Sequence, residues 1–331
     1  MSEIRRVLVT GGAGFVGSHL CELMINHGIS VICLDNFLTG NLDNIRTFRD
    51  FEGFDLVDHD VVEPYEFDVD AVLNLACPAS PVHYQADPVR TLMTSVLGMH
   101  NALTLGSRLG VPVLQASTSE VYGDPSVHPQ REEYWGNVNP DGPRACYDEG
   151  KRAAESLMFD FHRTRGTSIK VARIFNTYGP RMDPRDGRVV SNFIVQALQN
   201  EDITIYGSGE QTRSFCYVDD LCDGLFRLLL SGPDVTGPIN LGNPVEFSVG
   251  ALAELVIEMT GSRSNLALLP LPVDDPRQRR PDISRAAEQL GWRPSVSLRD
   301  GLEQTIAYFD AVLARRPIGG ERPAALAWGP N

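Results

Sequence analysis

The chain has 331 residues, enough for two domains or for one large domain with a smaller lobe. Its 29 basic and 43 acidic residues give a formal net charge of −14, which argues against a broad surface for nucleic acid or anionic membrane. The sequence contains no apolar run of about eighteen residues, so we expect no membrane span.

Targeting and metal-binding signals are missing from the sequence. The first residues lead straight into an apolar segment at 6–9, which leaves no room for a signal peptide. The six cysteines have neither CxxC spacing nor metal-like spacing with histidine. We therefore expect reduced cysteines, a cytoplasmic protein and no metal site.

The first half of the chain alternates short β-branched runs with longer helical patterns. We expect strands at residues 7–9, 30–34, 54–58, 71–75, 113–117 and 170–176. Helices are expected at 17–27, at about 88–109, and through Tyr147 and Lys151 to about Arg165. This alternation predicts an α/β fold with a doubly wound parallel (Rossmann) sheet, which binds ligands at the carboxyl ends of its strands.

The composition of the sequence changes after Gly179. A charged, turn-rich loop at 180–187 precedes an expected helix at 189–199 and a short strand at 203–206. Proline, glycine and arginine become more frequent through 268–281. We interpret this half as a smaller C-terminal α/β substrate lobe, from which residues 217–230 and 239–241 could rejoin the large sheet.

A glycine-rich turn follows the first expected strand. Gly11, Gly14 and Gly17 permit a tight turn, a close approach of the backbone to a pyrophosphate, and close packing of the next helix. Asp35 ends the second strand eighteen residues after Gly17, where its carboxylate can accept hydrogen bonds from ribose hydroxyls and repel a 2′-phosphate. Because residues 36–38 bring no cation, NAD is favoured over NADP.

Tyr147 and Lys151 are four residues apart and share one face of the expected helix. A lysine ammonium beside a phenol favours the phenolate, which can remove a proton from an alcohol while hydride leaves for a nicotinamide. Thr118, Ser119 and Glu120 stand at the end of an upstream strand. The pattern indicates redox chemistry on an alcohol, and the carboxylate hints at a second chemical step.

Six longer segments then make the chain resemble a known family. They are NLACPASP at 74–81, TSEVYGD at 118–124, YWGNVNP at 134–140, RACYDEGK at 144–151, RIFNTYGPR at 173–181 and DGRVVSNF at 186–193. Over about residues 5–312 the chain resembles the extended short-chain dehydrogenases/reductases that act on nucleotide sugars. Within these it is most similar to the UDP-glucuronate decarboxylases (UDP-xylose synthases).

The resemblance implies an activity and an assembly. NAD⁺ would oxidise carbon 4 of UDP-glucuronate with Tyr147 as base, the β-keto acid would lose carbon dioxide, and the NADH still bound would reduce the ketone to give UDP-xylose. The cofactor would be NAD, recycled at each turnover. A homodimer is expected, and neither nucleic acid nor membrane is expected as a partner.

The resemblance also implies roles for individual residues. The expected catalytic residues are Thr118, Ser119, Glu120, Tyr147, Lys151 and Arg279. The expected cofactor-binding residues are Gly11, Gly14, Phe15, Val16, Gly17, Asp35, Asn36, Phe37, Thr39, Gly40, Asp60, Val61, Leu75, Ala76, Thr94, Tyr147, Lys151, Thr177 and Arg188. The expected substrate-binding residues are Pro78, Ser80, Glu120, Asn176, Val190, Asn192, Phe193, Tyr206, Gly207, Gln211, Arg213 and Arg279.

The expected division of the chain follows from these assignments. It comprises an NAD-binding Rossmann domain at 1–178, rejoined by about 212–243, a nucleotide-sugar-binding lobe at 179–211 and 244–315, and a flexible tail at 316–331.

The chain departs from the family pattern at Met93, where relatives commonly have a lysine, and at Asp141, which replaces an apolar residue.

Three alternative functions remain open. A nucleotide-sugar 4,6-dehydratase needs a stronger acid than the Ser119 hydroxyl beside Glu120. A 4-epimerase would have the same tyrosine and lysine, with no need for the glutamate. A non-enzymatic NAD-binding scaffold or sensor typically lacks the tyrosine or the lysine, and both are present here.

Overall fold

The protein is described from a computed structural model, which covers residues 4–270 and 278–315. The tail expected at 316–331 lies outside the described residues.

Seven parallel strands form the central sheet, in the order β11-β6-β5-β4-β1-β2-β3. Their bounds are β1 (Arg6–Thr10), β2 (Ser30–Asp35), β3 (Phe54–Asp58), β4 (Ala71–Asn74), β5 (Val113–Thr118), β6 (Ile169–Ile174) and β11 (Ile239–Leu241). The strand order runs outward in both directions from the β1–β4 pair, so the predicted doubly wound fold is confirmed.

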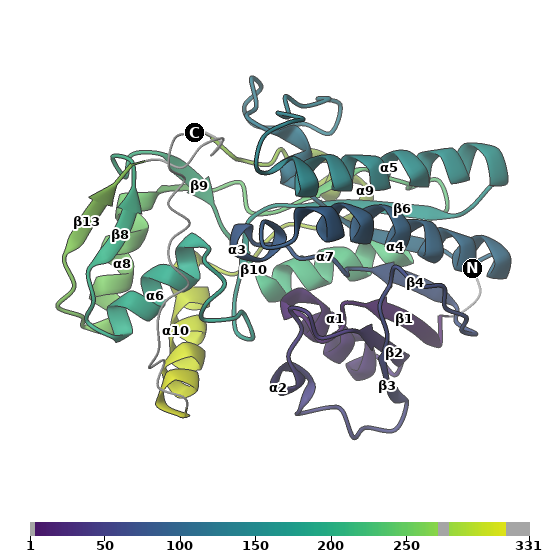
Figure 1. Ribbon diagram of the computed structural model, residues 1–331, viewed down its shortest axis with the longest axis horizontal. Coiled ribbons are helices and arrows are strands. Elements are labelled where there is room, and N and C mark those ends of the chain that lie inside the picture. The colour runs from purple at the N-terminus through teal and green to yellow at the C-terminus, as the bar shows by residue number, and fades with distance from the viewer. Residues whose placement is uncertain (1–3, 271–277, 316–331) are drawn as a thin grey trace.

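Helices cover both faces of this sheet (Figure 1). On one face lie α1 (Phe15–Asn26) and α7 (Val218–Leu230); on the other lie α4 (Pro88–Leu109) and α5 (Ala145–Arg165), side by side. Alternating side chains of each strand supply both cores. Val7 and Val9 join the core under α1, while Leu8 joins the core under α4 and α5.

A smaller lobe stands at one end of the sheet domain, on the left of Figure 1. In it, α6 (Val189–Leu198) and α8 (Val249–Thr260) pack beside the parallel pair β8 (Ile203–Tyr206) and β13 (Leu266–Leu269), with α10 (Leu298–Arg315) alongside. The antiparallel pair β9 (Thr212–Ser214) and β12 (Glu246–Ser248) continues from it. The remaining short elements are α2 (Leu42–Ile45), α3 (Pro81–Tyr84), the 3₁₀ turn η1 (Ser119–Tyr122), β7 (Thr177–Tyr178), β10 (Cys216–Tyr217) and α9 (Ser284–Leu290).

Most expected elements lie where the sequence puts them, and the differences have local causes. Strand β6 ends at Ile174, two residues earlier than expected, because the Phe175 N–H bonds to Leu241 and the chain then turns to pair Thr177 with Cys216. The sequence left α8, α9 and α10 unassigned. Among the helices of residues 4–270 and 278–315, none has the length and apolarity needed to cross a membrane.

The turn between β1 and α1 depends on two close backbone contacts. Gly11 has a φ of +68° and lies so near the chain after β4 that a Cβ atom would sit 2.9 Å from the Ala76 Cα. Gly17, in the first turn of α1, packs directly on Gly11, and a Cβ at Gly17 would overlap the Gly11 carbonyl oxygen. The turn therefore tolerates no side chain at either position.

We predict that Gly17→Ala lowers the free energy of unfolding by about 1–3 kcal/mol, because the added methyl group displaces the Gly11 peptide. Urea unfolding measures this change. Gly232→Ala is the matched control: a Cβ there meets nothing within 4 Å, so its stability should stay within about 0.5 kcal/mol of the parent. Equal stabilities of the two variants would contradict the packing argument.

Candidate active site

The glycine turn places the start of α1 at the carboxyl edge of the sheet. Gly14 caps the helix and no side chain caps the first turn, so the backbone N–H groups of Phe15 and Val16 face the turn. Because glycine lets the chain approach closely here, a pyrophosphate fits against these donors. The turn has the form of a dinucleotide cradle.

Asp35 lies beside this cradle at the end of β2. Its carboxylate accepts hydrogen bonds of 2.9 Å from the backbone N–H groups of Ala13 and Phe37, and it is 6% exposed. Burial raises the pKa of this carboxyl. Gly40 passes so close that a Cβ there would lie 2.6 Å from Asp35 Oδ1. This fixed carboxylate suits the hydroxyls of an adenosine ribose.

A second carboxylate, Asp60, stands next to Asp35 in the site. It accepts hydrogen bonds from Asn36 Nδ2 at 3.1 Å and from Arg90 Nη2 at 2.7 Å. The sequence analysis saw no cation in this region, and the structure brings Arg90 there from α4. That guanidinium is already paired with Asp60, so the preference for a cofactor without a 2′-phosphate stands.

Tyr147 and Lys151 lie on α5 beneath the end of β5. Lys151 Nζ donates to the Ala116 carbonyl oxygen at 2.9 Å, and the Thr118 hydroxyl hydrogen-bonds the Tyr147 side chain. The Tyr147 ring stacks on Tyr84 of α3, with centroids 5.1 Å apart. All of these side chains are buried, which prepares a dry site for proton transfer.

Burial dominates the pKa of Tyr147 in this arrangement. Burial raises the pKa of Tyr147, and Cys77 and Glu120 raise it further. Lys151 Nζ is 5.8 Å from the centre of the Tyr147 ring and is turned toward Ala116. Burial also lowers the pKa of Lys151 itself. Tyr147 and Lys151 share one face of α5 as expected, and the effect of the lysine on the phenol stays a prediction.

Glu120, in the turn η1, is held between two arginines. Arg144, which precedes α5, donates to Glu120 Oε2 at 2.6 Å, and Arg279 donates to Glu120 Oε1. Burial alone would raise the pKa of Glu120, but the two guanidiniums lower it to about 2. Arg279 is 4% exposed and also bonds to the Gly123 carbonyl. The result is a buried ionic cluster beside Tyr147.

Some of the expected substrate-binding residues have side chains with polar contacts at the site, and others have side chains in the protein interior. Gln211 bonds to the Tyr206 carbonyl, Arg213 donates to the Thr212 carbonyl at 2.9 Å, and the backbones of Arg213 and Arg279 form a bridge. The side chains of Val190 and Phe193 belong to the interior, as does that of Val61 from the expected cofactor-binding set. Arg188 is paired with Asp186 and interacts electrostatically with Tyr147, which places it near the reacting group.

The other predicted residues lie around the same edge. Ser80 bonds to His83, Thr94 to the Arg90 carbonyl, Thr177 to the Phe175 carbonyl, and Asn192 to the Gly187 carbonyl. Leu75 and Ala76 donate their N–H groups to Thr10. Among the described residues, no side-chain hydrogen bond is formed by Thr39, Pro78, Ser119, Asn176 or Gly207. Tyr84, Arg144 and Asp148 also lie at the site and were not predicted as site residues, although the last two belong to the RACYDEGK segment.

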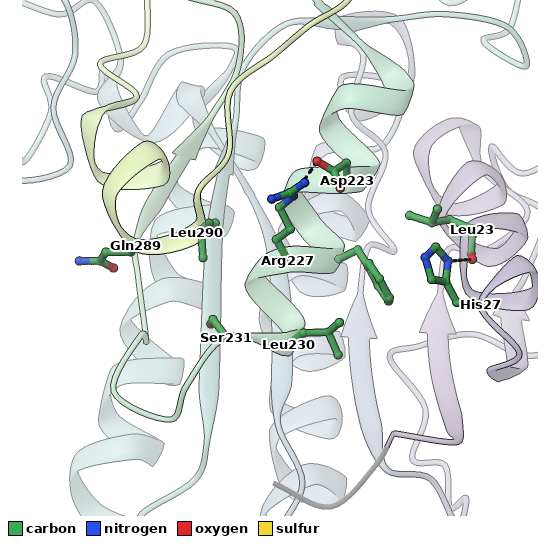
Figure 2. A pocket seen from close by; sticks show the side chains of 9 residues that line it. Leu23, His27, Asp223, Arg227, Leu230, Ser231, Gln289 and Leu290 are labelled. Carbon is green, nitrogen blue, oxygen red and sulfur yellow. Dashed lines mark hydrogen bonds and ion pairs between the residues drawn. The ribbon is translucent and has the colours of Figure 1, made fainter.

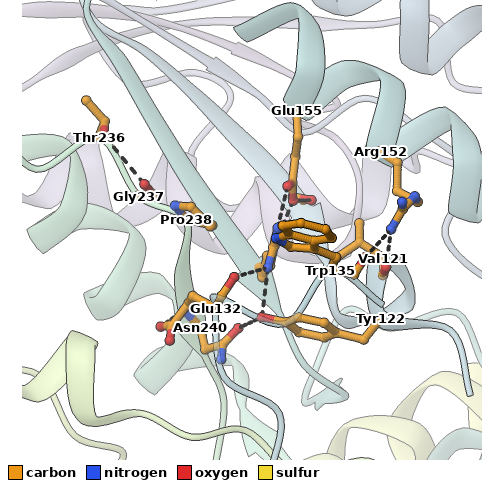
Figure 3. A network of polar contacts seen from close by, with 12 residues as sticks. Val121, Tyr122, Glu132, Trp135, Arg152, Glu155, Thr236, Gly237, Pro238 and Asn240 are labelled. Carbon is orange, nitrogen blue, oxygen red and sulfur yellow. Dashed lines mark hydrogen bonds and ion pairs between the residues drawn. The ribbon is translucent and has the colours of Figure 1, made fainter. Parts of the chain in front are cut away.

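A polar network supports η1 from below (Figure 3). Arg173 of β6 binds the Glu155 carboxylate through Nε and Nη2, and its Nη1 donates to the Tyr122 hydroxyl at 3.0 Å. That hydroxyl donates to Asn240 Oδ1 of β11 at 2.8 Å. Glu155 also accepts a hydrogen bond from Ser117, next to the catalytic Thr118 position. The network ties η1 to α5 and to two strands of the sheet.

The same network reaches the segment that carries Arg279. Asn240 Nδ2 donates to the carbonyls of Gln130 and Asp282 at 3.0 and 3.1 Å. The backbone N–H of Gln130 in turn donates to the Arg280 carbonyl, and the backbone N–H of Arg280 donates to Gln130 Oε1. The positions of Glu120 and Arg279 are therefore set by one connected set of bonds.

A groove outside this region lies between α1, α7 and α9 (Figure 2). It has a volume of about 400 Å³, and Leu23, His27, Phe226, Arg227 and Leu290 are among its lining residues. Its walls come from the C-terminal ends of α1 and α7, at the amino edge of the parallel sheet. It contains no predicted site residue.

Comparisons with known proteins agree with this arrangement. Residues 7–242 match the NAD dependent epimerase/dehydratase family. The chain is 57% identical to UDP-glucuronic acid decarboxylase 6 of Arabidopsis thaliana over 298 residues, which cover 90% of this chain and 86% of that protein. It is 53% identical to UDP-glucuronic acid decarboxylase 1 of Xenopus tropicalis, covering 92% and 72% respectively.

A solved structure shares the fold at lower identity. UDP-glucuronic acid 4-epimerase from Bacillus cereus, in complex with UDP-glucuronic acid and NAD, has a TM-score of 0.83 and 28% identity. The match covers 93% of this chain and 99% of that one.

We predict that Tyr122→Phe lowers the free energy of unfolding by about 1–3 kcal/mol, because Asn240 Oδ1 loses its buried donor. Urea unfolding tests this. Tyr65→Phe is the control, since the buried Tyr65 hydroxyl has no hydrogen-bond partner among the described residues, and its removal should be neutral or stabilising. A larger loss in the control than in Tyr122→Phe would refute the role given to the network.

Proposed function

The chain belongs to the NAD dependent epimerase/dehydratase family and, within it, to the UDP-glucuronic acid decarboxylases, and we propose that it converts UDP-glucuronate into UDP-xylose and carbon dioxide. The observation that carries the proposal is the pairing of Arg144 and Arg279 on Glu120 beside Tyr147. Two buried guanidiniums give a sugar carboxylate a partner at the place where a hydroxyl is oxidised.

The cofactor is NAD, and the turn at Gly11, Gly14 and Gly17, with Asp35, holds it. When bound there, NAD would supply the acceptor for the hydride of carbon 4 and, once reduced, its donor. Tyr147 takes the proton of the 4-hydroxyl as its phenolate, which the Lys151 ammonium, 5.8 Å from the ring centre, favours, and Thr118 hydrogen-bonds the same side chain. The side chains of Ser119 and Glu120 line the same reaction space next to Tyr147.

Oxidation at carbon 4 makes the sugar a β-keto acid. Its carboxylate then leaves as carbon dioxide, and the bonding electrons remain on the sugar as an enolate that the ketone stabilises. Arg279 and Arg144 stabilise the negative charge on both sides of this step. Protonation at carbon 5 and reduction at carbon 4 complete UDP-xylose, with no net redox change.

The smaller lobe holds the nucleotide diphosphate. We assign this to Arg188, Asn192, Tyr206, Gln211 and Arg213, and the backbone bridge between Arg213 and Arg279 and the interaction of Arg188 with Tyr147 support the assignment. The chain then divides into an NAD-binding domain at 1–178, rejoined by about 212–243, and a nucleotide-sugar lobe at 179–211 and 244–315. The six free cysteines support a reducing, cytoplasmic location.

The rival activities fit the site less well. A 4,6-dehydratase needs an acid beside Glu120 for a departing hydroxyl, and Ser119 is too weak. A 4-epimerase does not need the Glu120 cluster, and the epimerase neighbour is 28% identical against 57% for the decarboxylase relative. The complete Tyr147 and Lys151 pair argues against a scaffold.

Purified protein incubated with UDP-glucuronate and a small amount of NAD⁺ tests the proposal. Mass spectrometry should find a product lighter by carbon dioxide, and proton NMR should identify UDP-xylose. A product of unchanged mass would make the protein an epimerase, and loss of water would make it a dehydratase.

We predict that Tyr147→Phe lowers the turnover of UDP-glucuronate by at least about 100-fold, because no group then takes the 4-hydroxyl proton. NAD⁺ affinity, followed by fluorescence titration, should change little. Tyr308→Phe on α10 is the control and should retain full activity. Comparable turnover in Tyr147→Phe and the parent would remove Tyr147 from the reaction.

We also propose a homodimer that pairs through α4 and α5. Along α4, four apolar side chains are exposed: Val89 (72%), Leu92 (36%), Met93 (43%) and Leu97 (37%). Val89, Met93 and Leu97 recur every fourth residue, so they line one stripe of the helix. The departure at Met93 adds to this stripe, and apolar stripes of this kind are covered in stable assemblies.

Leu97→Glu should convert the dimer into a monomer, because it places a charge in the covered stripe. Sedimentation equilibrium measures the mass directly. Val245→Glu introduces the same charge at a 54% exposed site away from α4 and should leave the mass unchanged. A monomeric parent protein, or a Leu97→Glu variant that stays dimeric, would exclude this interface.

A further inference from the structure

Asp148 is a buried carboxyl next to Tyr147 that the reaction described above does not use. It lies in the first turn of α5 and is 6% exposed. Its Oδ1 atom is fully buried, and no group among residues 4–270 and 278–315 donates a hydrogen bond to it. An ionised carboxylate without donors is unfavourable in such surroundings, so this position favours the neutral acid.

The groups around Asp148 come from every element packed against it. They are Cys146 and Glu149 on its own helix, Arg144 before the helix, Glu120 in η1, Tyr84 in α3 and Arg279 in the C-terminal segment. Arg144 and Arg279 both donate hydrogen bonds to Glu120. Burial, followed by the charge of Glu120, raises the pKa of Asp148 to about 7, although both arginines oppose the shift.

A proton on Asp148 balances the charges of Glu120, the two guanidiniums paired with it and the substrate carboxylate. Glu120 and Asp148 face two guanidiniums, and the substrate brings a third carboxylate to the same place. Three carboxylates against two guanidiniums leave one negative charge over, which a proton on Asp148 cancels. After carbon dioxide has left and carbon 5 has been protonated, two carboxylates and two guanidiniums remain, and the cluster is again neutral.

We propose that Asp148 stores the proton that the reaction consumes and delivers it through Glu120 to carbon 5 of the sugar. This inference rests on the proposed decarboxylation. It gives Asp148 a task that Glu120 cannot perform alone, since Glu120 is held ionised by Arg144 and Arg279.

The transfer balances in atoms and charge. When the sugar carboxylate shares the arginines, Glu120 gains affinity for a proton, and the O–H bond of Asp148 breaks as one forms on Glu120. That O–H bond then breaks as the C–H bond at carbon 5 forms, and the electron pair left by carbon dioxide is used in the new bond. Asp148, now a carboxylate, takes a proton from water before the next turnover.

Asp148→Asn tests the proposal, because asparagine keeps the shape and cannot supply the proton. In a single turnover with UDP-glucuronate, reduced nicotinamide should appear at the parent rate. UDP-xylose formation should then slow by about 100-fold, with the cofactor staying reduced and no 4-keto pentose accumulating, because that ketone forms only after carbon 5 is protonated. Asp160→Asn, the same change at an exposed site on the same helix, should behave as the parent.

The pH profile gives an independent readout. In the parent, the protonation step should slow as the pH rises through about 7, because the acid form of Asp148 is the donor. In Asp148→Asn this dependence should disappear. If the variant does not fold, the parent profile decides: a protonation rate that is constant from about pH 6 to about pH 8 overturns the proposal.

The remaining outcomes are distinct. If Asp148→Asn forms UDP-xylose like the parent at every pH, the proton store is wrong while the decarboxylase activity stands. If a folded variant already fails to reduce the cofactor, Asp148 serves the oxidation and the proposal is overturned. If the parent releases no carbon dioxide from UDP-glucuronate, the proposed function fails and this inference with it.

Discussion

The ionic cluster of Glu120, Arg144 and Arg279 is the interaction on which the site depends. It joins three parts of the chain that are distant in sequence: the turn after β5, the loop before α5 and the segment after β13. Because all three side chains are largely buried, breaking one pair would leave an uncompensated charge in the interior. The cluster therefore holds the sheet domain and the smaller lobe in a fixed relation at the carboxyl edge.

The polar network beneath it supplies the rigidity that such a cluster needs. Arg173, Tyr122 and Asn240 connect β6, η1 and β11 through bonds that leave few alternatives for the turn carrying Glu120. Buried polar networks specify one arrangement when every member is satisfied. The short strand β11 matters here mainly because it carries Asn240 to the centre of the network.

Almost all strands and helices of the sheet domain could be predicted from the sequence, because the signals for secondary structure are local. Helix α4 has a capping Asp87 before Pro88 and a left-handed Gly110 after Leu109, so both of its ends were legible. The pairing of Glu120 with Arg144 and Arg279 could not be predicted in this way. Arg144 is 24 residues from Glu120 and Arg279 is 159 residues away, and no periodicity relates such positions. Family resemblance pointed to Arg279, but the burial that raises the pKa of Asp148 exists only in the fold.

The bonds between Gln130 and the segment at 280–282 have a consequence for how the protein is made. The backbone of Gln130 pairs with Arg280 and Asp282, and this pairing sets the place of Arg279. The sheet strands up to β6 are synthesised long before that segment leaves the ribosome. A nascent chain can therefore assemble the dinucleotide cradle early, but its ionic cluster is completed only after Arg279 and the residues that position it have been synthesised.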